Sequence, residues 1–319
     1  MQASTRIVHA VDQNEFLLEG KKGVHSAQSY LKSSLLITLL VTIFTLVPLF
    51  LFQEWGKGLI QFVETAGGGF VFSVSLNPKT AAGAMMIFVV LNSSILGLGC
   101  GTLLAEKFIH KRSIQRMFSL GKFNYKAFAF GFIAWATLIA FSGLVDVFVL
   151  HEITVFHWDV IKWLLFLPLV LLLTPLQCMS EEIFFRTYLM RVIYARTKKP
   201  IAVLLILTLI FAVVHLPNIA LMSGRNLESY PVSFVSYLTI SYLLAYLAYR
   251  SKGIELSIGI HLANNLMYFI VLNSLDSYTG FIPSIFDVKS TNIYWGCISL
   301  ILSSLILIAV YRKIENTWL

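Results

Sequence analysis

The stretch MSEEIFFRTYLM, residues 179–190, places two adjacent glutamates and an arginine within one of the most apolar regions of the chain. A charge at the centre of a membrane helix costs about 2.5–3.5 kcal/mol on insertion scales, and such residues usually face the interior of a bundle or a wet cavity. Glu182 and Arg186 are four residues apart, so they share a helix face and can neutralise each other. Glu181 points about 100° away and needs another partner. The stretch therefore predicts a functional site within the membrane.

The rest of the chain has the composition of a membrane protein. Its 319 residues are 57% hydrophobic and 13% charged, with a mean hydropathy of +0.79, whereas soluble domains carry about 25% charged residues. We predict an all-α polytopic bundle of about eight transmembrane helices, because apolar runs of about 20 residues recur and the alternation of an outer-membrane barrel is absent. The predicted spans are residues 33–52, 81–105, 127–150, 160–195, 201–216, 232–249, 254–273 and 293–311.

Basic residues in the connecting loops orient these spans. Cytoplasmic loops carry an excess of Lys and Arg, and alternate connectors of this chain hold most of them. These are Lys107, Lys111, Arg112, Arg116, Lys122, Lys126, Arg191, Arg196, Lys198, Lys199, Arg250, Lys252, Arg312 and Lys313. Both termini are therefore predicted to be cytoplasmic. The net charge of +8 follows from this asymmetry, and its scatter over short loops argues against a nucleic-acid partner.

Four parts of the chain follow from this organisation. Residues 1–32 are polar and lack the apolar core of a signal peptide, so we predict a cytoplasmic segment. Residues 33–119 are predicted to form two accessory transmembrane helices and a basic loop, residues 120–275 the core that bears the motifs, and residues 276–319 a loop and the last helix. We expect a multi-pass integral protein in the plasma membrane of a bacterium.

Two histidines on later spans are the candidate partners of Glu181. His215 ends the stretch FAVVH on the fifth span, and His261 opens the stretch HLANN on the seventh. Phe211 and Asn265 lie four residues from these histidines, on the same helix faces. A lone histidine in an apolar helix is more often a packing residue. Two histidines together with an unpaired glutamate and an asparagine instead favour one shared polar cavity.

The depths of the three motifs agree only in part. At about 1.5 Å per helical residue, Glu181 and His261 lie about 15 and 12 Å from the cytoplasmic ends of their helices, while His215 lies about 22 Å from Pro200. Either the fifth helix begins after Pro200, or it is tilted.

The cysteines indicate neither a metal site nor a reactive thiol. Cys100, Cys178 and Cys297 each lie in an apolar span at no metal-binding spacing, and are predicted to be small buried hydrophobes. Cys178 is three residues from Glu181, but a catalytic thiol needs a cationic or histidine neighbour, and the sequence identifies none.

The three motifs together resemble a known family. EEIFFR, FAVVH and HLANN match the patterns EExxxR, FxxxH and HxxxN, in that order, on three membrane spans. The set resembles the CPBP family of intramembrane proteases, also called the Abi family, which includes the type II CAAX prenyl endopeptidases. The resemblance covers about residues 120–275, so the first two spans and the N-terminal segment lie outside it.

This resemblance implies a role for each matching residue. Glu181 would be the general base that activates water, assisted by His215. His261 and Asn265 would bind the oxyanion of the tetrahedral intermediate. Supporting roles, in holding the catalytic helix and shaping the pocket, would belong to Glu182, Arg186 and Phe211.

Metal dependence stays open at this point, because the family has been described both as metalloproteases and as metal-independent glutamate proteases. A carboxylate base with imidazole and amide donors in an apolar cavity suits the hydrolysis of a peptide bond without a serine or cysteine nucleophile. Glu181, His215 and His261 could also make a three-ligand zinc site. We favour the interpretation without a cofactor.

An intramembrane endopeptidase is therefore the first hypothesis for function. Its partners would be the lipid bilayer and a peptide or protein substrate, which in the family includes lipid-modified CAAX proteins and, for bacterial members, peptides linked to bacteriocin immunity. The second hypothesis is a non-catalytic membrane scaffold for immunity or peptide binding. The third, a proton-coupled transporter, is weaker because residues 1–150 contain no second copy of the EE motif, whereas many transporters have internal repeats.

Overall fold

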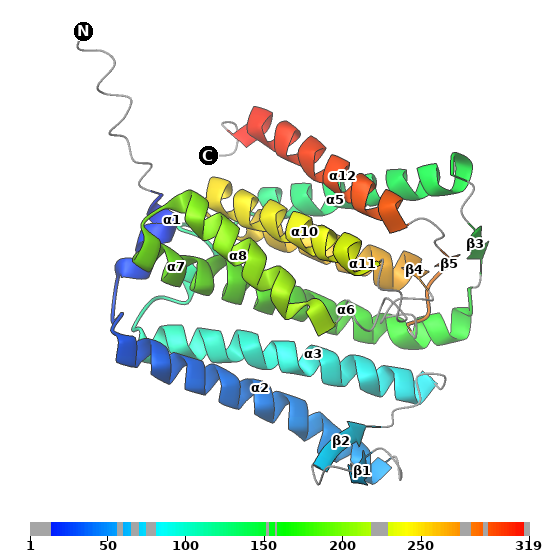
Figure 1. Ribbon diagram of the computed structural model, residues 1–319, viewed down its shortest axis with the longest axis horizontal. Coiled ribbons are helices and arrows are strands. Elements are labelled where there is room, and N and C mark those ends of the chain that lie inside the picture. Colours follow the sequence, from blue (N-terminus) through cyan, green and yellow to red (C-terminus); the bar gives the residue numbers. More distant parts are fainter. Residues whose placement is uncertain are drawn as a thin grey trace.

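The protein is a bundle of helices that run side by side along its long axis (Figure 1). The computed structural model describes residues 14–55, 60–64, 70–74, 81–150, 153–156, 158–217, 229–274, 282–289 and 293–315. Within these ranges, six helices are long and apolar enough to cross a membrane: Ala27–Leu51, Ala84–Ile109, Tyr125–Phe148, Val160–Thr197, Ser229–Ser251 and Tyr294–Ile314. The predicted all-α polytopic fold is confirmed. The count of eight spans and the cytoplasmic location of the termini stay predictions.

Eight helices of the described part of the chain build the bundle, and shorter helical segments extend or connect them. The eight are α2 (Ala27–Trp55), α3 (Ala81–Leu104), α5 (Tyr125–Phe148), α6 (Val160–Glu182), α8 (Pro200–Val214), α10 (Ser229–Ser251), α11 (Glu255–Leu266) and α12 (Ile293–Ile314). The short helices are α1 (Glu15–Leu18), η1 (Glu19–Lys21), α4 (Gln115–Phe118) and α7 (Met190–Thr197). Three π-helical segments continue α3, α6 and α11, namely η2 (Ala105–Ile109), η3 (Ile183–Leu189) and η4 (Met267–Val271).

Two of the eight predicted spans are shorter than the six long helices. Helix α8 has 15 residues, and α11 has 12 before it continues into η4. Pro200 opens α8, where its ring suits the first helical turn. The alternative that this helix begins after Pro200 is therefore wrong. Figure 1 shows α8 inclined to the long axis of the bundle, which agrees with the alternative of a tilted helix.

Short strands that the sequence did not predict lie at the end of the bundle away from α1 and α7 (Figure 1). They have three to five residues each, too few to alter the helical architecture. One antiparallel pair joins β1 (Ile60–Glu64) and β2 (Phe70–Val74). A second sheet has the order β3-β5-β4, from Ile153–Phe156, Phe286–Lys289 and Leu272–Ser274.

Close helix packing positions the motif-bearing helices. A Cβ at Gly259 on α11 would overlap the backbone carbonyl of Phe128 on α5, so only glycine permits this approach. A Cβ at Gly99 on α3 would likewise overlap the Ser180 side chain, next to Glu181 on α6. Small residues at such crossings let membrane helices approach closely. The functional residues therefore lie on a rigid part of the bundle.

The segment before α2 folds across one end of the bundle. Asn14 caps α1 by accepting from the backbone N–H groups of Phe16 and Leu17, and both of these side chains are buried. Asn14 also donates to the carbonyl of Tyr249 at 2.7 Å. Residues 14–20 of the polar segment predicted for residues 1–32 are therefore packed against the helices, residues 21–28 are exposed, and residues 1–13 lie outside the described part of the chain.

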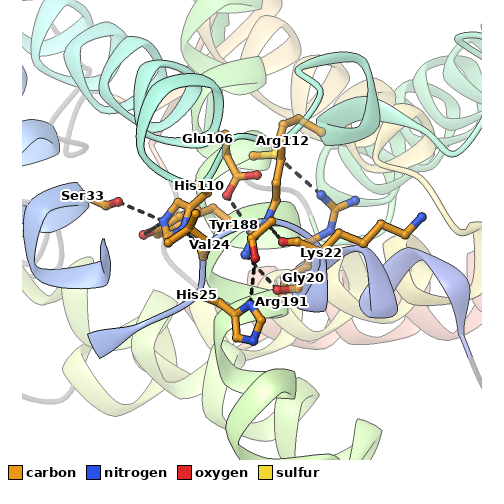
Figure 2. Close-up of polar contacts among 12 residues, drawn as sticks. Gly20, Lys22, Val24, His25, Ser33, Glu106, His110, Arg112, Tyr188 and Arg191 are labelled. Carbon is orange, nitrogen blue, oxygen red and sulfur yellow. Dashed lines mark hydrogen bonds and ion pairs between the residues drawn. The ribbon is translucent and has the colours of Figure 1, made fainter. Parts of the chain in front are cut away.

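A group of buried side chains holds this segment, and Figure 2 shows it. We name it the N-terminal clamp, and it consists of Glu106, His110, Arg112, Tyr188 and Arg191. The Arg112 guanidinium donates to Glu106 at 2.8 Å, to the carbonyl of Lys22 at 2.7 Å and to the carbonyl of Gly20 at 2.8 Å. His110 Nδ1 donates to the carbonyl of Val24 at 2.6 Å, because a carbonyl can only accept.

Arg191, which the sequence places among the cytoplasmic loop charges, is instead part of α7 and only 1% exposed. Its guanidinium donates to the carbonyls of Phe16 at 3.0 Å and Arg116 at 2.6 Å. The basic pattern that orients the spans therefore contains residues that fix the N-terminal segment.

Candidate active site

The motifs on α6 and α11 are in direct contact, and the motif on α8 is joined to them where Arg186 packs on Phe211. Glu181 and Glu182 end α6, Phe211 and His215 lie at the end of α8, and His261 and Asn265 lie on α11. The proline-containing helix α6 passes directly into the π-helical segment η3, which carries Arg186. Such π-helical segments are frequent at functional sites.

Glu181 is turned into the bundle and is only 6% exposed. Its two oxygens have different surroundings. Oε1 accepts a hydrogen bond from Gln177 Nε2 at 2.7 Å, and Oε2 lies 3.9 Å from His261 Nε2. The second distance is too long for a direct hydrogen bond but allows both groups to bind the same water molecule. Glu181 thus has one oxygen held by the protein and one directed at an imidazole.

His261 is oriented by Glu182. Its Nδ1 lies 2.8 Å from Glu182 Oε1, and because an ionised carboxylate only accepts, Nδ1 is the donor. This bond leaves Nε2 directed towards Glu181. The sequence placed His261 beside Glu181 and Asn265 without a bond to Glu182. A carboxylate that fixes the second ring nitrogen is what a functional imidazole needs to hold one tautomer.

His215 is the C-cap of α8, and its tautomer is also determined. Nδ1 donates to the carbonyl of Phe211 at 2.7 Å, so the neutral ring presents the lone pair of Nε2. The ring stacks on Phe211 at 4.1 Å and lies 4.8 Å from the ring of Tyr237. The charges of Glu181 and His261 both act on it. The three motifs therefore share one electrostatic environment.

Glu182 and Arg186 are fully buried and 3.2 Å apart, as their spacing predicts. The guanidinium carbon also lies 4.4 Å from the centroid of the Phe211 ring and 5.6 Å from that of Phe185. Among the described residues, none of the three guanidinium nitrogens has a hydrogen-bond partner. Nη1 is close to the carboxylate but poorly aligned with it, since the π-helical turn after Glu182 holds more residues than an α-helical turn.

Sequence analysis missed the residues that connect these motifs. Gln177 lies four residues before Glu181 and accepts from Asn265 Nδ2 at 3.0 Å. Asn264 Nδ2 donates to Asn265 Oδ1 at 3.2 Å, and Trp135 Nε1 on α5 donates to Asn264 Oδ1 at 3.3 Å. The i, i+4 spacing of Gln177 and Glu181 was the one available signal.

Cys178 lies closer to the site than its interpretation as an inert hydrophobe suggests. Cys178 and Cys297 are buried as predicted, whereas the prediction for Cys100 is wrong because that side chain is exposed. Asn265 Nδ2 lies 3.5 Å from the Cys178 sulfur, and this thiol is within hydrogen-bonding reach of the His261 ring. The structure thus supplies the histidine neighbour that the sequence could not identify.

The donor set does not fit a three-ligand metal site. Within the part of the chain that the structure describes, no three His, Cys, Asp or Glu side chains are grouped closely enough to hold a metal ion. Nδ1 of His261 and Nδ1 of His215 are hydrogen-bonded to Glu182 and to a backbone carbonyl, which leaves Nε2 of each ring available. The zinc alternative for Glu181, His215 and His261 stays a prediction.

Comparison with known proteins agrees with the geometry. Residues 162–267 match the family described as type II CAAX prenyl endopeptidase Rce1-like. We refer to these matched residues as the Rce1-like segment. The Rce1-like segment contains all three motifs and lies within the range of residues 120–275 that the sequence predicts, although those boundaries stay predictions.

One curated relative extends the similarity beyond the Rce1-like segment. The uncharacterized protein YyaK of Bacillus subtilis (strain 168) is 31% identical over 198 residues, which are 61% of this chain and 64% of the relative. The match thus spans less than two thirds of that relative's length. No solved structure matches the chain.

Proposed function

We propose that the protein is an intramembrane endopeptidase in which Glu181 activates a water molecule to hydrolyse a peptide bond. The observation that supports this most strongly is the unequal use of the Glu181 carboxylate. Oε1 is held by Gln177 at 2.7 Å, and Oε2 is directed at His261 Nε2 across 3.9 Å. A water molecule bound between Oε2 and the imidazole is oriented and has a base beside it.

The reaction follows from this placement. Glu181 takes one proton from the water while the water oxygen bonds to the carbonyl carbon of the substrate. His215, whose neutral ring offers Nε2 as an acceptor, assists the transfer. The C–N bond then breaks, the proton on Glu181 passes to the leaving nitrogen, and the products are a carboxylic acid and an amine. General base catalysis of this kind contributes about 10²–10⁴-fold to the rate.

The oxyanion of the intermediate is bound by Asn265 and His261. Asn265 has an amide NH₂ at the site, with one N–H beyond the one that Gln177 accepts. His261 donates its Nδ1–H to Glu182, so Nε2 can donate to the oxyanion only when the ring carries both protons. The positive charge of that form lies beside the carboxylates of Glu181 and Glu182. Each donor directed at an oxyanion in a low-dielectric site is worth about 3–4 kcal/mol.

The supporting residues hold the catalytic end of α6. Glu182 orients His261 and lies against Arg186, and the guanidinium packs on Phe211. Phe211 also stacks on His215, so one ring joins the two halves of the site. These contacts support the roles that the family resemblance assigns to Glu182, Arg186 and Phe211.

The substrate is proposed to be a membrane-delivered peptide or protein. Helices α5, α6 and α10 beside the site are long and apolar enough to span a bilayer, which favours a substrate that reaches the site from within the membrane. The family description of the Rce1-like segment names CAAX prenyl endopeptidases, which makes lipid-modified peptides the first class to assay. We propose the plasma membrane of a bacterium as the location, in line with the Bacillus subtilis relative.

Digestion of defined peptides by the purified protein tests this proposal. The protein in lipid vesicles is incubated with prenylated and unmodified peptide libraries, with and without a strong chelator, and the products are identified by mass spectrometry. We expect cleavage that survives chelation and incorporates one oxygen from labelled water. Absence of products from both libraries contradicts the proposal. Cleavage that a chelator abolishes and zinc restores would instead establish a metalloprotease.

A further inference from the structure

We propose that a directional chain of three side-chain amides positions the catalytic base, an inference that rests on the proposed function. The chain begins at an indole N–H and ends at a carboxylate. Its members, in order of donation, are Trp135, Asn264, Asn265, Gln177 and Glu181.

Each link is a hydrogen bond between buried or part-buried side chains. Trp135 Nε1 donates to Asn264 Oδ1 at 3.3 Å, and Asn264 Nδ2 donates to Asn265 Oδ1 at 3.2 Å. Asn265 Nδ2 then donates to Gln177 Oε1 at 3.0 Å, and Gln177 Nε2 donates to Glu181 Oε1 at 2.7 Å. The bonds shorten towards the carboxylate, in the order expected when the last acceptor is charged.

The two ends of the chain determine its direction. Indole N–H can only donate, and an ionised carboxylate can only accept. Every amide between them must therefore accept at its oxygen from the preceding member and donate from its nitrogen to the next. A flipped Asn264, Asn265 or Gln177 would set two donors or two acceptors against each other. The alternation of donors and acceptors along three helices is thus one cooperative unit.

The chain is anchored in rigid packing. Trp135 is 1% exposed on α5, and the close contact at Gly259 holds α5 against α11, which carries both asparagines. The hydrogen bond from Asn265 to Gln177 then connects α11 to α6. The position of the Glu181 carboxylate therefore depends on α5, a helix outside the Rce1-like segment and outside the three motifs.

In this amide chain Gln177 positions both the base, Glu181, and the oxyanion donor, Asn265. Gln177 holds Oε1 of Glu181 and so leaves Oε2 for the water, and it holds one N–H of Asn265 and so aims the other at the oxyanion. Gln177 is a positioning residue, since it acts through Glu181 and Asn265. Its loss changes the alignment and charge of the base while substrate contacts remain.

The test compares Gln177→Met with Thr174→Val in the vesicle assay. Thr174 is the matched control because it lies one turn earlier on α6, and its buried hydroxyl has no hydrogen-bond partner among the described residues. For Gln177→Met we expect kcat to fall about 10- to 100-fold, with KM within about threefold. The acidic limb of the pH profile should move up by about one pH unit, since the charged carboxylate loses a donor. Thr174→Val should resemble wild type.

Two further variants keep the test decisive if Gln177→Met does not fold. Gln177→Glu should move the acidic limb further, because two adjacent carboxylates resist joint ionisation. Trp135→Phe keeps an aromatic ring but removes the indole N–H, the first donor of the chain. We expect kcat to fall by about two- to tenfold, less than in Gln177→Met, because polarisation weakens along the chain.

Failure of this inference is distinguishable from failure of the proposed function. If wild type does not cleave, or Glu181→Gln retains full activity, the proposed function is wrong. If wild type cleaves, Glu181→Gln does not, and folded Gln177 and Trp135 variants keep wild-type kcat and pH profile, only the amide chain is wrong. Equal losses in Thr174→Val and Gln177→Met would also overturn it, because they would indicate a general packing effect.

Discussion

Two buried arginines in this protein are paired with glutamates in opposite ways. In the N-terminal clamp, Arg112 donates to Glu106 and to two backbone carbonyls, as Figure 2 shows. In the candidate active site, Arg186 lies 3.2 Å from Glu182 and packs on Phe211, but its nitrogens have no hydrogen-bond partner within the described ranges.

The difference separates a structural cluster from a functional one. Buried polar groups are normally hydrogen-bonded, and an unsatisfied one costs about 1–3 kcal/mol. Arg112 follows that rule, and its bonds hold the N-terminal segment in place. Glu182 instead accepts its best-aligned hydrogen bond from His261, and Arg186 balances its charge. The site thus accepts weaker pairing in exchange for an oriented imidazole, as functional sites often do.

Arg112→Met should have the largest effect on stability. It leaves Glu106 as an uncompensated buried charge and releases two backbone carbonyls, so we expect the free energy of unfolding to fall by about 3–5 kcal/mol. Chemical unfolding in detergent measures it. Lys107→Met, which removes an exposed charge next to Glu106, should change little. An unchanged unfolding free energy for Arg112→Met would show that the clamp does not stabilise the fold.

Arg186→Met should cost less stability, about 1–3 kcal/mol, because its guanidinium makes no hydrogen bond that can be lost and Glu182 keeps the bond from His261. Methionine keeps the apolar contact with Phe211. Activity should nevertheless fall, since Glu182 then lacks a counter-charge while it orients His261. The same unfolding assay, run beside Arg112→Met, decides this point. A stability loss equal to that of Arg112→Met contradicts the comparison.

Acidification should destabilise the N-terminal clamp, by less than either arginine substitution does. Burial lowers the pKa of His110 below its usual 6.5, and the charges of Arg112 and His25 act in the same direction, against the hydrogen bond to the carbonyl of Val24. The unfolded state therefore binds the proton more readily, and stability falls as the pH drops below 6.5 towards the folded-state value.

Hydrogen exchange of residues 14–26 measured between pH 7 and pH 5 tests this effect. Protection of the segment should decrease on acidification in wild type and become less pH-dependent in His110→Phe. The same pH dependence in both proteins would remove His110 from the account.

Cys178→Ala should have the smallest effect on chemistry. The thiol lies beside His261 and Asn265, so a cysteine nucleophile is the alternative to activated water. With Glu181 as the base, we expect kcat/KM within about threefold of wild type, because the thiol makes only weak hydrogen bonds. Complete loss of cleavage in a folded Cys178→Ala protein would favour the thiol mechanism.

The sequence was informative where residues follow a helical period. The apolar runs predicted the helices, and spacings of four placed Glu182 beside Arg186. It could not predict the contacts that depend on how helices cross. The tilt of α8, the bond between His261 and Glu182, and the link from Trp135 through Asn264 all depend on tertiary packing. The connector arginines were also ambiguous, since a charge in a short loop and a charge folded onto the bundle have the same local pattern.

The most direct test of the central claim is the cleavage rate of Glu181→Gln, measured beside its thermal unfolding. Glu106→Gln is the matched control, because it makes the same substitution in the N-terminal clamp. We predict that Glu181→Gln lowers kcat/KM by about 10²–10⁴-fold with an unchanged unfolding midpoint, while Glu106→Gln lowers the midpoint and leaves the activity of the folded protein intact. Wild-type cleavage by a folded Glu181→Gln protein would contradict the account.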